Sequence, residues 1–379
     1  MQTYKISLSD AKKFYKELGC DDGGITILAR KTKLHTLYIK NMHVGAANIL
    51  KQDALSIGAD LAVPNGVIIA KDKYVDAVLI GTTKHFELLS RKELAQPFGL
   101  KNLAKTLKDY VKETNYKTKI MGVLNANDDS FFQDSRFNSF EASLKIEKMI
   151  EDGANIIDIG AVSSRPGSLP VCEEVELERL KDIVDTIYSN KYYEKVDFSI
   201  DSYSPLVINY VLNHGFKIVN DITGLQNDEV CKIAAKYNAQ VVIMHMQNNQ
   251  TNMQDNPTYK NVILEIDDFF KERIEKAKSF GIEDIVLDVG IGFGKTLEHN
   301  LLLLKNLEHF KHFGYELLIG ASRKSMINMI TPCEIKDRLA GTLAIHLESL
   351  RSGASIIRCH DVKEHFQAIK VFEAINSIN

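Results

Sequence analysis

Three cationic side chains in this sequence have the types and spacing that bind phosphate groups. Arg358 and His360 stand two residues apart at the end of an apolar run, so in an extended strand they share one side. Arg165 precedes Pro166 and Gly167 in a loop that follows another apolar run. An arginine guanidinium binds a phosphate or diphosphate bidentately. The alternative for Arg358 is a buried ion pair with a carboxylate at the end of a neighbouring strand.

A second set of side chains carries hydrogen-bond acceptors. Asp201, Asn220 and Asp288 each stand at the end of an apolar run. Together they would suit a flat heterocycle with adjacent N–H groups, such as an aminopyrimidinone. Any one of them alone would more often be a turn or cap residue. Asp158 lies in the middle of its run, which favours a structural role for it.

The loop after Asp288 is rich in glycine but is not a nucleotide-binding motif. It reads Gly290-Ile-Gly-Phe-Gly-Lys295, and its glycine spacing is neither that of a dinucleotide fingerprint nor that of a P-loop. We expect a tight turn that lets the backbone approach a ligand. Met244 and Met246 flank His245 and would pack in the core or form the floor beneath a planar ligand.

These residues lie at the ends of strands in a regular strand–helix alternation with a period of about 30 residues. The eight predicted strands are Lys119–Asn125, Asn155–Gly160, Asp197–Asp201, Lys217–Asp221, Gln240–His245, Asp284–Val289, Glu316–Ala321 and Ala354–His360. Eight such units over about 260 residues predict a (β/α)₈ TIM barrel, with a doubly wound open sheet as the alternative. In a barrel the carboxyl ends of the strands meet at one mouth, where the polar side chains would converge.

Residues 1–115 lack this alternation and predict a small α/β domain, followed by the barrel over 118–379. The polar stretch Thr114–Lys119 marks the boundary. The elements expected in the small domain are strands at His35–Asn41, Val67–Ala70 and Val75–Ile80 and helices at Asn48–Ala62 and Leu100–Val111. The role of this domain stays open: it could cap the barrel, mediate self-association or do something else.

The composition is that of a soluble globular protein. The chain has 379 residues, of which 45% are hydrophobic and 26% charged, with a net charge of −3. This charge suggests no nucleic-acid or acidic-membrane partner, and no apolar run reaches the ~18 residues of a membrane helix. The five cysteines include no Cys-x-x-Cys pair, which argues against a zinc site. Because the start also lacks an apolar signal core, we expect a cytoplasmic protein.

Seven stretches, in order from about Lys119 to the carboxyl end, resemble the dihydropteroate synthases, a family of pterin-binding barrels. They are Met121-Gly-Val-Leu-Asn-Ala-Asn-Asp-Asp-Ser-Phe, Ile156-Ile-Asp-Ile-Gly with Ser163-Ser-Arg-Pro-Gly, Asn220-Asp-Ile, Met244-His-Met-Gln, Asp288 with Gly292-Phe-Gly-Lys, Ser322-Arg-Lys-Ser-Met, and Ile357-Arg-Cys-His-Asp-Val-Lys-Glu. The resemblance implies a transferase of folate biosynthesis. Such an enzyme joins 6-hydroxymethyl-7,8-dihydropterin diphosphate to p-aminobenzoate and releases pyrophosphate. Residues 1–115 lie outside the resemblance.

The resemblance also implies roles for individual residues. Those that would contact the pterin are Asp201, Asn220, Met244, Asp288, Arg323 as a shield, and Lys324. Those that would hold the diphosphate are Ser164, Arg165, Arg358 and His360. Ser164, Pro166 and Phe293 would border the aminobenzoate. Of all these, the residues predicted to act in catalysis are Arg165, Lys324, Arg358 and His360.

The same resemblance implies Mg²⁺ as the cofactor, with Asn125 as its ligand, and a homodimer. The chain departs from the usual family pattern at three places: Ala126-Asn-Asp stands for Val-Thr-Pro, Ala161-Val-Ser-Ser stands for Gly-Glu-Ser-Thr, and Val289 replaces a proline. Two alternatives remain. One is methyl transfer from methyltetrahydrofolate to a corrinoid protein, against which the arginines argue. The other is a pterin-binding paralogue without activity, which the altered first loop would favour.

Overall fold

The structure is a computed structural model that describes residues 1–126, 135–162, 171–248 and 251–378. The chain divides into two compact units. The first is Met1–Thr114 with the short segments His312–Gly314 and Phe372–Asn379, and the second is Asn115–Lys311 with Tyr315–Val371. The division after Thr114 lies in the polar stretch expected as the boundary. No helix within the described ranges is long and apolar enough to cross a membrane.

The first unit is a small α/β domain around an antiparallel sheet. Among its described residues, β1 (Leu34–His43), β3 (Tyr74–Thr82) and β2 (Asp60–Ala62) pair in that order. The helices are α1 (Ala11–Glu17), α2 (Asp22–Thr32), α3 (Val44–Ile57), η1 (Val67–Ile69), α4 (Thr83–Lys92), η2 (Glu93–Ala95) and α5 (Leu100–Tyr110). Leu50, Leu79 and Phe86 belong to its buried apolar core. The predicted strands His35–Asn41 and Val75–Ile80 and the predicted helix at Leu100 are therefore confirmed.

Two expectations for this unit were wrong. Val67–Ala70 forms the 3₁₀ turn η1 and not a strand, because the residues that flank the turn, Gly66 and Ala70, have left-handed φ angles of 90° and 52°. The helix expected over Asn48–Ala62 ends at Ile57, since Gly58 caps it with a φ of 88°. Asp60–Ala62 then forms the short strand β2.

The second unit is the predicted TIM barrel. In the described part of the chain, eight parallel strands close in the order β10-β11-β4-β5-β6-β7-β8-β9, and β9 pairs again with β10. The strands are β4 (Lys119–Asn125), β5 (Ile156–Gly160), β6 (Asp197–Asp201), β7 (Ile218–Asp221), β8 (Gln240–Met244), β9 (Ile285–Asp288), β10 (Glu316–Ile319) and β11 (Ile356–Cys359). Their ends differ from the predicted ends by at most two residues. The open-sheet alternative is excluded.

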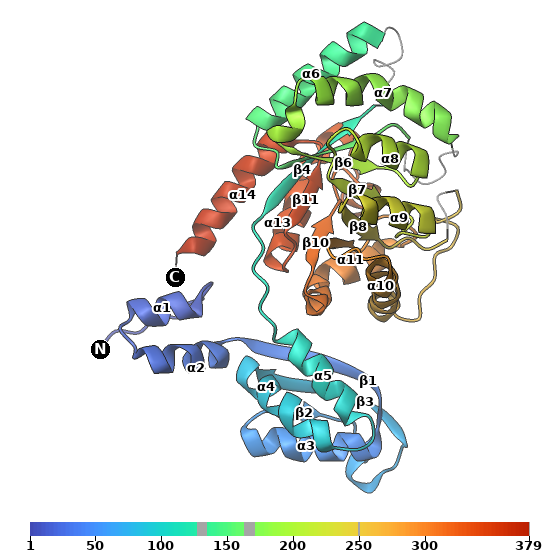
Figure 1. Ribbon diagram of the computed structural model, residues 1–379. Coiled ribbons are helices and arrows are strands. Elements are labelled where there is room, and N and C mark those ends of the chain that lie inside the picture. Colours follow the sequence, from blue (N-terminus) through green and yellow to red (C-terminus); the bar gives the residue numbers. More distant parts are fainter. Residues whose placement is uncertain (127–134, 163–170, 249–250, 379) are drawn as a thin grey trace. The chain divides into compact units, whose positions relative to one another are not determined.

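Helices surround these strands, as the ribbon in Figure 1 shows. They are α6 (Ser135–Glu151), α7 (Glu173–Ser189), η4 (Tyr192–Glu194), α8 (Pro205–Leu212), α9 (Asp228–Lys236), α10 (Val262–Ser279), α11 (Leu297–Lys305), η5 (Leu307–Phe313), α12 (Ser325–Ile330), η6 (Ile335–Asp337), α13 (Leu339–Arg351) and α14 (Val362–Ser377). Capping residues in the sequence determine where several of these helices begin. Ser204 caps α8 by accepting from the Val207 N–H, and Pro205 occupies the first turn.

The interior of the barrel is filled by a layer of apolar side chains from seven strands. They are Met121, Ile156, Ile218, Val242, Val286, Leu318 and Ile356, all buried and joined in one cluster. Side chains on a strand alternate between its two faces, so a residue two positions further along faces the same interior. We call this apolar layer the apolar plug. The next layer, toward the carboxyl ends of the strands, is therefore formed by the residues two positions further along each strand.

Candidate active site

The layer above the apolar plug carries most of the polar side chains singled out in the sequence. The residues two positions beyond plug residues are Asp158 on β5, Asn220 on β7, Met244 on β8, Asp288 on β9 and Arg358 on β11. Asp201 ends β6 and pairs in register with Asn220. A barrel thus gathers residues from positions 158 to 358 of the chain around one axis.

Arg358 is the centre of a buried ion-pair network in this layer. Its Nε donates to Asp158 Oδ2 at 2.6 Å, and its Nη2 donates to Asp201 Oδ2 at 2.8 Å. Asn220 Nδ2 donates to the same Asp158 oxygen at 3.1 Å. Asp158 is fully buried, whereas the Arg358 side chain keeps 22% of its surface exposed. One guanidinium therefore ties together the carboxylates of two strands.

This network settles one alternative from the sequence and agrees with one expectation. The buried ion pair considered for Arg358 exists, but Nη1 of Arg358 has no partner among the described residues, so donors remain for a ligand. Asp158 was assigned a structural role because it is mid-strand. It lies in the polar layer, and its Oδ1 is buried without a hydrogen-bond partner within the described ranges. Its contacts with Arg358 and Asn220 agree with the structural role that was expected.

The two other carboxylates of the layer are held in a dry environment. Burial raises the pKa of Asp201 to about 7, although the neighbouring guanidinium of Arg358 lowers it. Burial also raises the pKa of Asp288, while a hydrogen bond from Gly290 N and the charges of Lys324 and Lys295 lower it. Ordinary aspartates in water would bind ring N–H groups only weakly. In this low-dielectric layer the same acceptors bind such donors more strongly.

The glycine loop after β9 has the tight turn that its sequence predicts. Gly290 has a φ of 68°, and a Cβ there would lie 2.0 Å from the carbonyl oxygen of His245. The turn brings Gly290 N within 2.7 Å of Asp288 Oδ1. Lys295 was not predicted as a site residue. Its buried Nζ donates to the carbonyl of His245 at 3.1 Å and to that of Phe293 at 2.9 Å, and these bonds hold the loop in place.

One side of the mouth is apolar. Met244 and Phe293 belong to a single buried cluster with Ile222 and Met253. Lys324 lies over the Phe293 ring, with Nζ 4.0 Å from the ring centroid. The prediction that the methionine forms a floor for a planar ligand is compatible with this arrangement, because Met244 pairs in register with the buried acceptor Asp288.

Two loops at the ends of β10 and β11 interlock. Ser322 Oγ lies 2.9 Å from His360 Nδ1, and Arg323 donates to both carboxylate oxygens of Asp361, at 2.9 Å from Nε and 2.6 Å from Nη2. Arg323 Nη1 also donates to the carbonyls of Ile335 and Lys336 at 3.1 Å. The guanidinium of Arg323 is thus occupied by protein groups in this structure, and its role as a shield over a pterin stays a prediction.

Four predicted residues come from the end of β4 and from the segment that follows β5 in the sequence. Asn125 ends β4 and is half-buried at the strand end. Its amide oxygen is a ligand that Mg²⁺ accepts beside phosphate oxygens and water, so the residues present fit that ion. Ser164, Arg165 and Pro166 lie outside the described residues.

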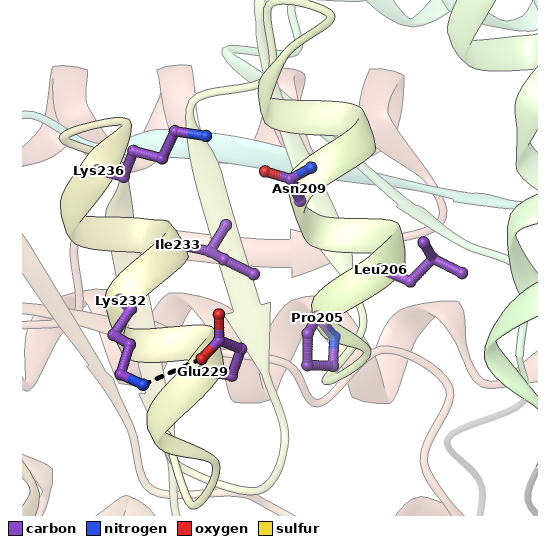
Figure 2. A pocket seen from close by; sticks show the side chains of 7 residues that line it. All are labelled: Pro205, Leu206, Asn209, Glu229, Lys232, Ile233 and Lys236. Atoms are coloured by element: carbon purple, nitrogen blue, oxygen red, sulfur yellow. Dashed lines mark hydrogen bonds and ion pairs between the residues drawn. The ribbon is translucent and has the colours of Figure 1, made fainter.

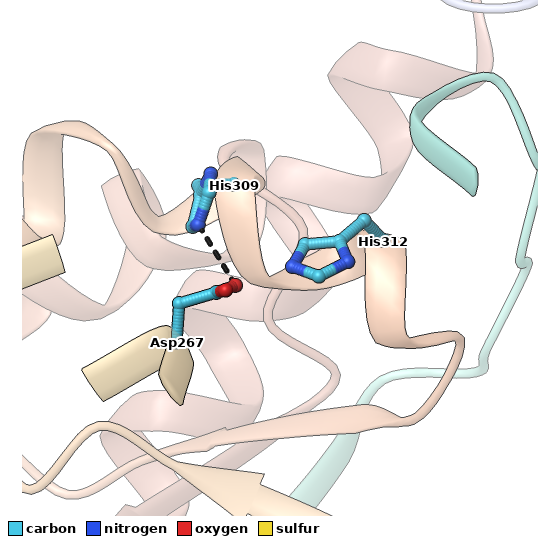
Figure 3. Close-up of side chains that lie close together, drawn as sticks. All are labelled: Asp267, His309 and His312. Carbon is cyan, nitrogen blue, oxygen red and sulfur yellow. Dashed lines mark hydrogen bonds and ion pairs between the residues drawn. The ribbon is translucent and has the colours of Figure 1, made fainter. Parts of the chain in front are cut away.

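Two other features of the barrel are not part of this site. A hollow between the outer helices α8 and α9, drawn in Figure 2, is lined by Pro205, Leu206, Asn209, Glu229, Lys232, Ile233 and Lys236 and by no strand-end side chain. Figure 3 shows Asp267 of α10, which lies 3.1 Å from His309 Nε2. Lys271 Nζ also contacts this carboxylate at 2.5 Å, so its charge is already paired and we assign no metal ion to it.

Comparison with known proteins decides the family. Residues 121–360 match the family described as pterin binding enzyme. The chain is 45% identical over 338 residues to a bifunctional dihydropteroate synthase/dihydropteroate reductase of Helicobacter pylori, a match that covers 89% of each protein. It is 41% identical over 258 residues to a dihydropteroate synthase of Escherichia coli, covering 67% of this chain and 90% of that one.

This chain belongs to the dihydropteroate synthase family of pterin-binding enzymes.

Solved structures of this family have the same barrel. A Yersinia pestis dihydropteroate synthase in complex with a sulfonamide drug is 37% identical and superposes with a TM-score of 0.64, covering 69% of this chain and 95% of that one. A Thermus thermophilus dihydropteroate synthase in complex with 4-aminobenzoate is 34% identical with a TM-score of 0.62, covering 68% and 95%. The fold and the family expected from the sequence are therefore confirmed.

We predict that Asp158→Asn lowers the free energy of unfolding by about 3 kcal/mol, because it removes the buried charge that compensates Arg358. The matched control is Asp197→Asn, which breaks the exposed pair between Asp197 and Lys217 and should cost at most about 1 kcal/mol. Chemical denaturation of both variants measures the difference. Equal small losses would show that the guanidinium does not depend on Asp158.

Proposed function

We propose that this chain catalyses the dihydropteroate synthase reaction, the condensation of 6-hydroxymethyl-7,8-dihydropterin diphosphate with p-aminobenzoate to 7,8-dihydropteroate and pyrophosphate. The observation that carries the proposal is the polar layer itself. The acceptors Asp201, which is mostly buried, and Asp288, which is buried, lie with the amide of Asn220 and the cation Arg358 above one apolar plug. Family membership and the relatives' names agree with this chemistry.

The pterin would bind against the acceptors. Its aminopyrimidinone edge carries adjacent N–H groups, which Asp201 and Asp288 can accept, while the amide of Asn220 can both donate and accept. Lys324 would donate to a ring acceptor from its position over Phe293. The apolar cluster with Met244 would lie against the flat face of the ring. Binding there would exclude water from the acceptors and strengthen each hydrogen bond.

The leaving group would be held by cations. The bond that breaks joins a methylene carbon to a diphosphate oxygen, so the charge that develops is on the pyrophosphate. Arg358 and His360, with Arg165, would neutralise it by hydrogen bonds. A Mg²⁺ ion held by Asn125 and the diphosphate oxygens would supply further charge neutralisation. Since the arylamine itself is the nucleophile, the protein's part is positioning and electrostatics.

The two alternatives explain less. A methyltransferase acting on methyltetrahydrofolate has no diphosphate to hold, so it gives no ligand to Arg165, to His360 or to the Arg358 donors that the ion pairs leave over. A paralogue without activity would bind pterin but release no pyrophosphate. Mg²⁺ dependence, a homodimer and a cytoplasmic location stay predictions.

Incubation of the purified chain with the dihydropterin diphosphate, p-aminobenzoate and Mg²⁺ should give dihydropteroate. In the same assay, Arg358→Ala should lower kcat/KM by at least ~10²-fold, the scale of one lost preorganised donor at a developing charge. The control is Arg351→Ala, which removes an exposed arginine from α13 and should act like the wild type. Substrate binding without any product would favour the inactive paralogue, and normal turnover by Arg358→Ala would refute its role.

One observation favours a second activity. The match to the bifunctional Helicobacter pylori protein spans 338 residues, which is more than the chain from Asn115 to its end contains. The match must continue into the first unit, whereas the match to the Escherichia coli synthase has about the length of the barrel. We therefore propose that the first unit contributes to a dihydropteroate reductase activity. Reduction of the dihydropterin ring needs a hydride donor, such as a reduced nicotinamide or flavin.

The reductase proposal can be separated from the synthase reaction. Dihydropteroate supplied with NADPH or NADH, with and without flavin, should be converted to tetrahydropteroate by the full chain. Arg358→Ala should keep this conversion while it loses the synthase reaction, because reduction releases no diphosphate. Failure of every donor to support reduction by an otherwise active synthase would overturn the proposal.

A further inference from the structure

Two buried histidines form a hydrogen-bonded chain behind the barrel mouth. His346 lies on α13 and His365 on α14, and each is 1% exposed. The backbone N–H of Ala321 donates to His346 Nε2 at 3.1 Å. His346 Nδ1 lies 2.8 Å from His365 Nε2, and His365 Nδ1 lies 2.6 Å from the carbonyl oxygen of Asp361. The chain therefore runs from the loop after β10 to the residue that precedes α14.

The partners at the two ends fix where every proton of this chain lies. A backbone N–H can only donate, so His346 Nε2 is unprotonated and His346 carries its proton on Nδ1. A carbonyl can only accept, so His365 donates from Nδ1 and its Nε2 accepts from His346. A second proton on either ring would place two donors face to face. The chain holds together only while both imidazoles are neutral.

The surroundings favour that neutral state. Burial lowers the pKa of His346 well below the usual histidine value, and the nearby His365 and His360 lower it further. Burial also lowers the pKa of His365, against the opposing effects of the hydrogen bond to Asp361 and the charges of Asp361 and Glu364. The carboxylate of Asp361 is itself paired with Arg323, and this pairing weakens its stabilisation of a protonated His365.

The chain connects the two segments that carry predicted ligand-binding cations. Ala321 directly precedes Ser322, Arg323 and Lys324, and Asp361 directly follows His360. The contacts between Ser322 and His360 and between Arg323 and Asp361 join the same two segments on the side of the mouth. The histidine chain joins them from behind, from two different helices. Their relative position is thus fixed from both sides.

We propose that His346 and His365 are positioning residues of the synthase site, which set the spacing between the Lys324 and His360 segments through a chain that exists only when both rings are neutral. The proposal rests on the proposed synthase function. Neither histidine touches a substrate in it. Their effect reaches the ligand through the Ala321 N–H and the Asp361 carbonyl.

A spectroscopic test addresses the wild-type chain directly and needs no activity. Nitrogen NMR of the full chain labelled with ¹⁵N-histidine should show two neutral rings protonated at Nδ1, the tautomer less favoured in water, that do not titrate near pH 6.5. His346→Gln and His365→Gln identify the two signals by their loss. Rings protonated at Nε2, or ordinary titration of both, would overturn the proposal.

A kinetic test measures the positioning. His346→Leu should lower kcat/KM for the dihydropterin diphosphate by about tenfold or more, since small displacements of binding groups have large effects on rate. His365→Leu should act similarly, and the double variant should lose no more than either single variant, because both belong to one chain. His346→Gln should recover part of the loss, since its amide can accept from Ala321 and donate to His365.

The controls separate this inference from the proposed function. His214→Leu removes a histidine whose ring contacts Tyr210 on the outer helices and should leave turnover unchanged. If the wild type makes no dihydropteroate, the proposed function fails while the NMR test of the chain still stands. If the wild type is active and the folded His346→Leu variant matches it in kcat/KM, the positioning role is wrong. If the leucine variants do not fold, the folded His346→Gln variant decides, since wild-type kcat/KM in it would overturn the positioning role.

Discussion

The pairing of one arginine with two aspartates from other strands constrains the rest of the barrel. A guanidinium inside a protein costs several kcal/mol unless its charge is compensated by well-placed partners. Arg358 finds these partners in Asp158 and Asp201, 200 and 157 residues away along the chain. Between them in the sheet lies β4, which contributes Val123 and no charge. Because β11, β4, β5 and β6 are consecutive in the sheet, side chains on their shared inner face bring the three charges into contact.

The same network explains how the site can have two chemically different ends. The layer contains more carboxylates than guanidinium groups. Carboxylate oxygens therefore remain to accept hydrogen bonds from the N–H groups of a ring. Lys324 and His360, which would bind the ring and the diphosphate respectively, come from loops that contact Phe293, Ser322 and the histidine chain. The strand residues Asp201, Asp288 and Arg358 are therefore held by the barrel, whereas Lys324 and His360 are positioned by contacts between loops. A reaction that separates a ring from a diphosphate needs acceptors at one end of the site and cations at the other.

The sequence predicted the barrel well because its signals are local. β-branched runs with a period of about 30 residues place every barrel strand within two residues of its observed ends. The small first unit has no such repeat, and Val67–Ile69 became a 3₁₀ turn because flanking left-handed residues override its strand propensity.

The site was predicted less completely, because hydrogen bonds across a barrel leave no local pattern. A structural role was expected for Asp158, but its partner Arg358, 200 residues away, could not be identified from the sequence. The occupied guanidinium of Arg323 and the histidine chain depend on partners far apart in sequence.

The central claim is that Asp201 and Asp288 bind the ring and that Arg358 and His360 bind the diphosphate. The most direct test is calorimetry with two ligands, the dihydropterin diphosphate and the corresponding alcohol without the diphosphate. Asp288→Asn should weaken both ligands equally, by about tenfold or more for a lost hydrogen bond to a charged acceptor. His360→Ala should weaken the diphosphate alone. If Asp288→Asn left the alcohol's affinity unchanged, or His360→Ala weakened both ligands equally, the assignment of the two ends would be contradicted.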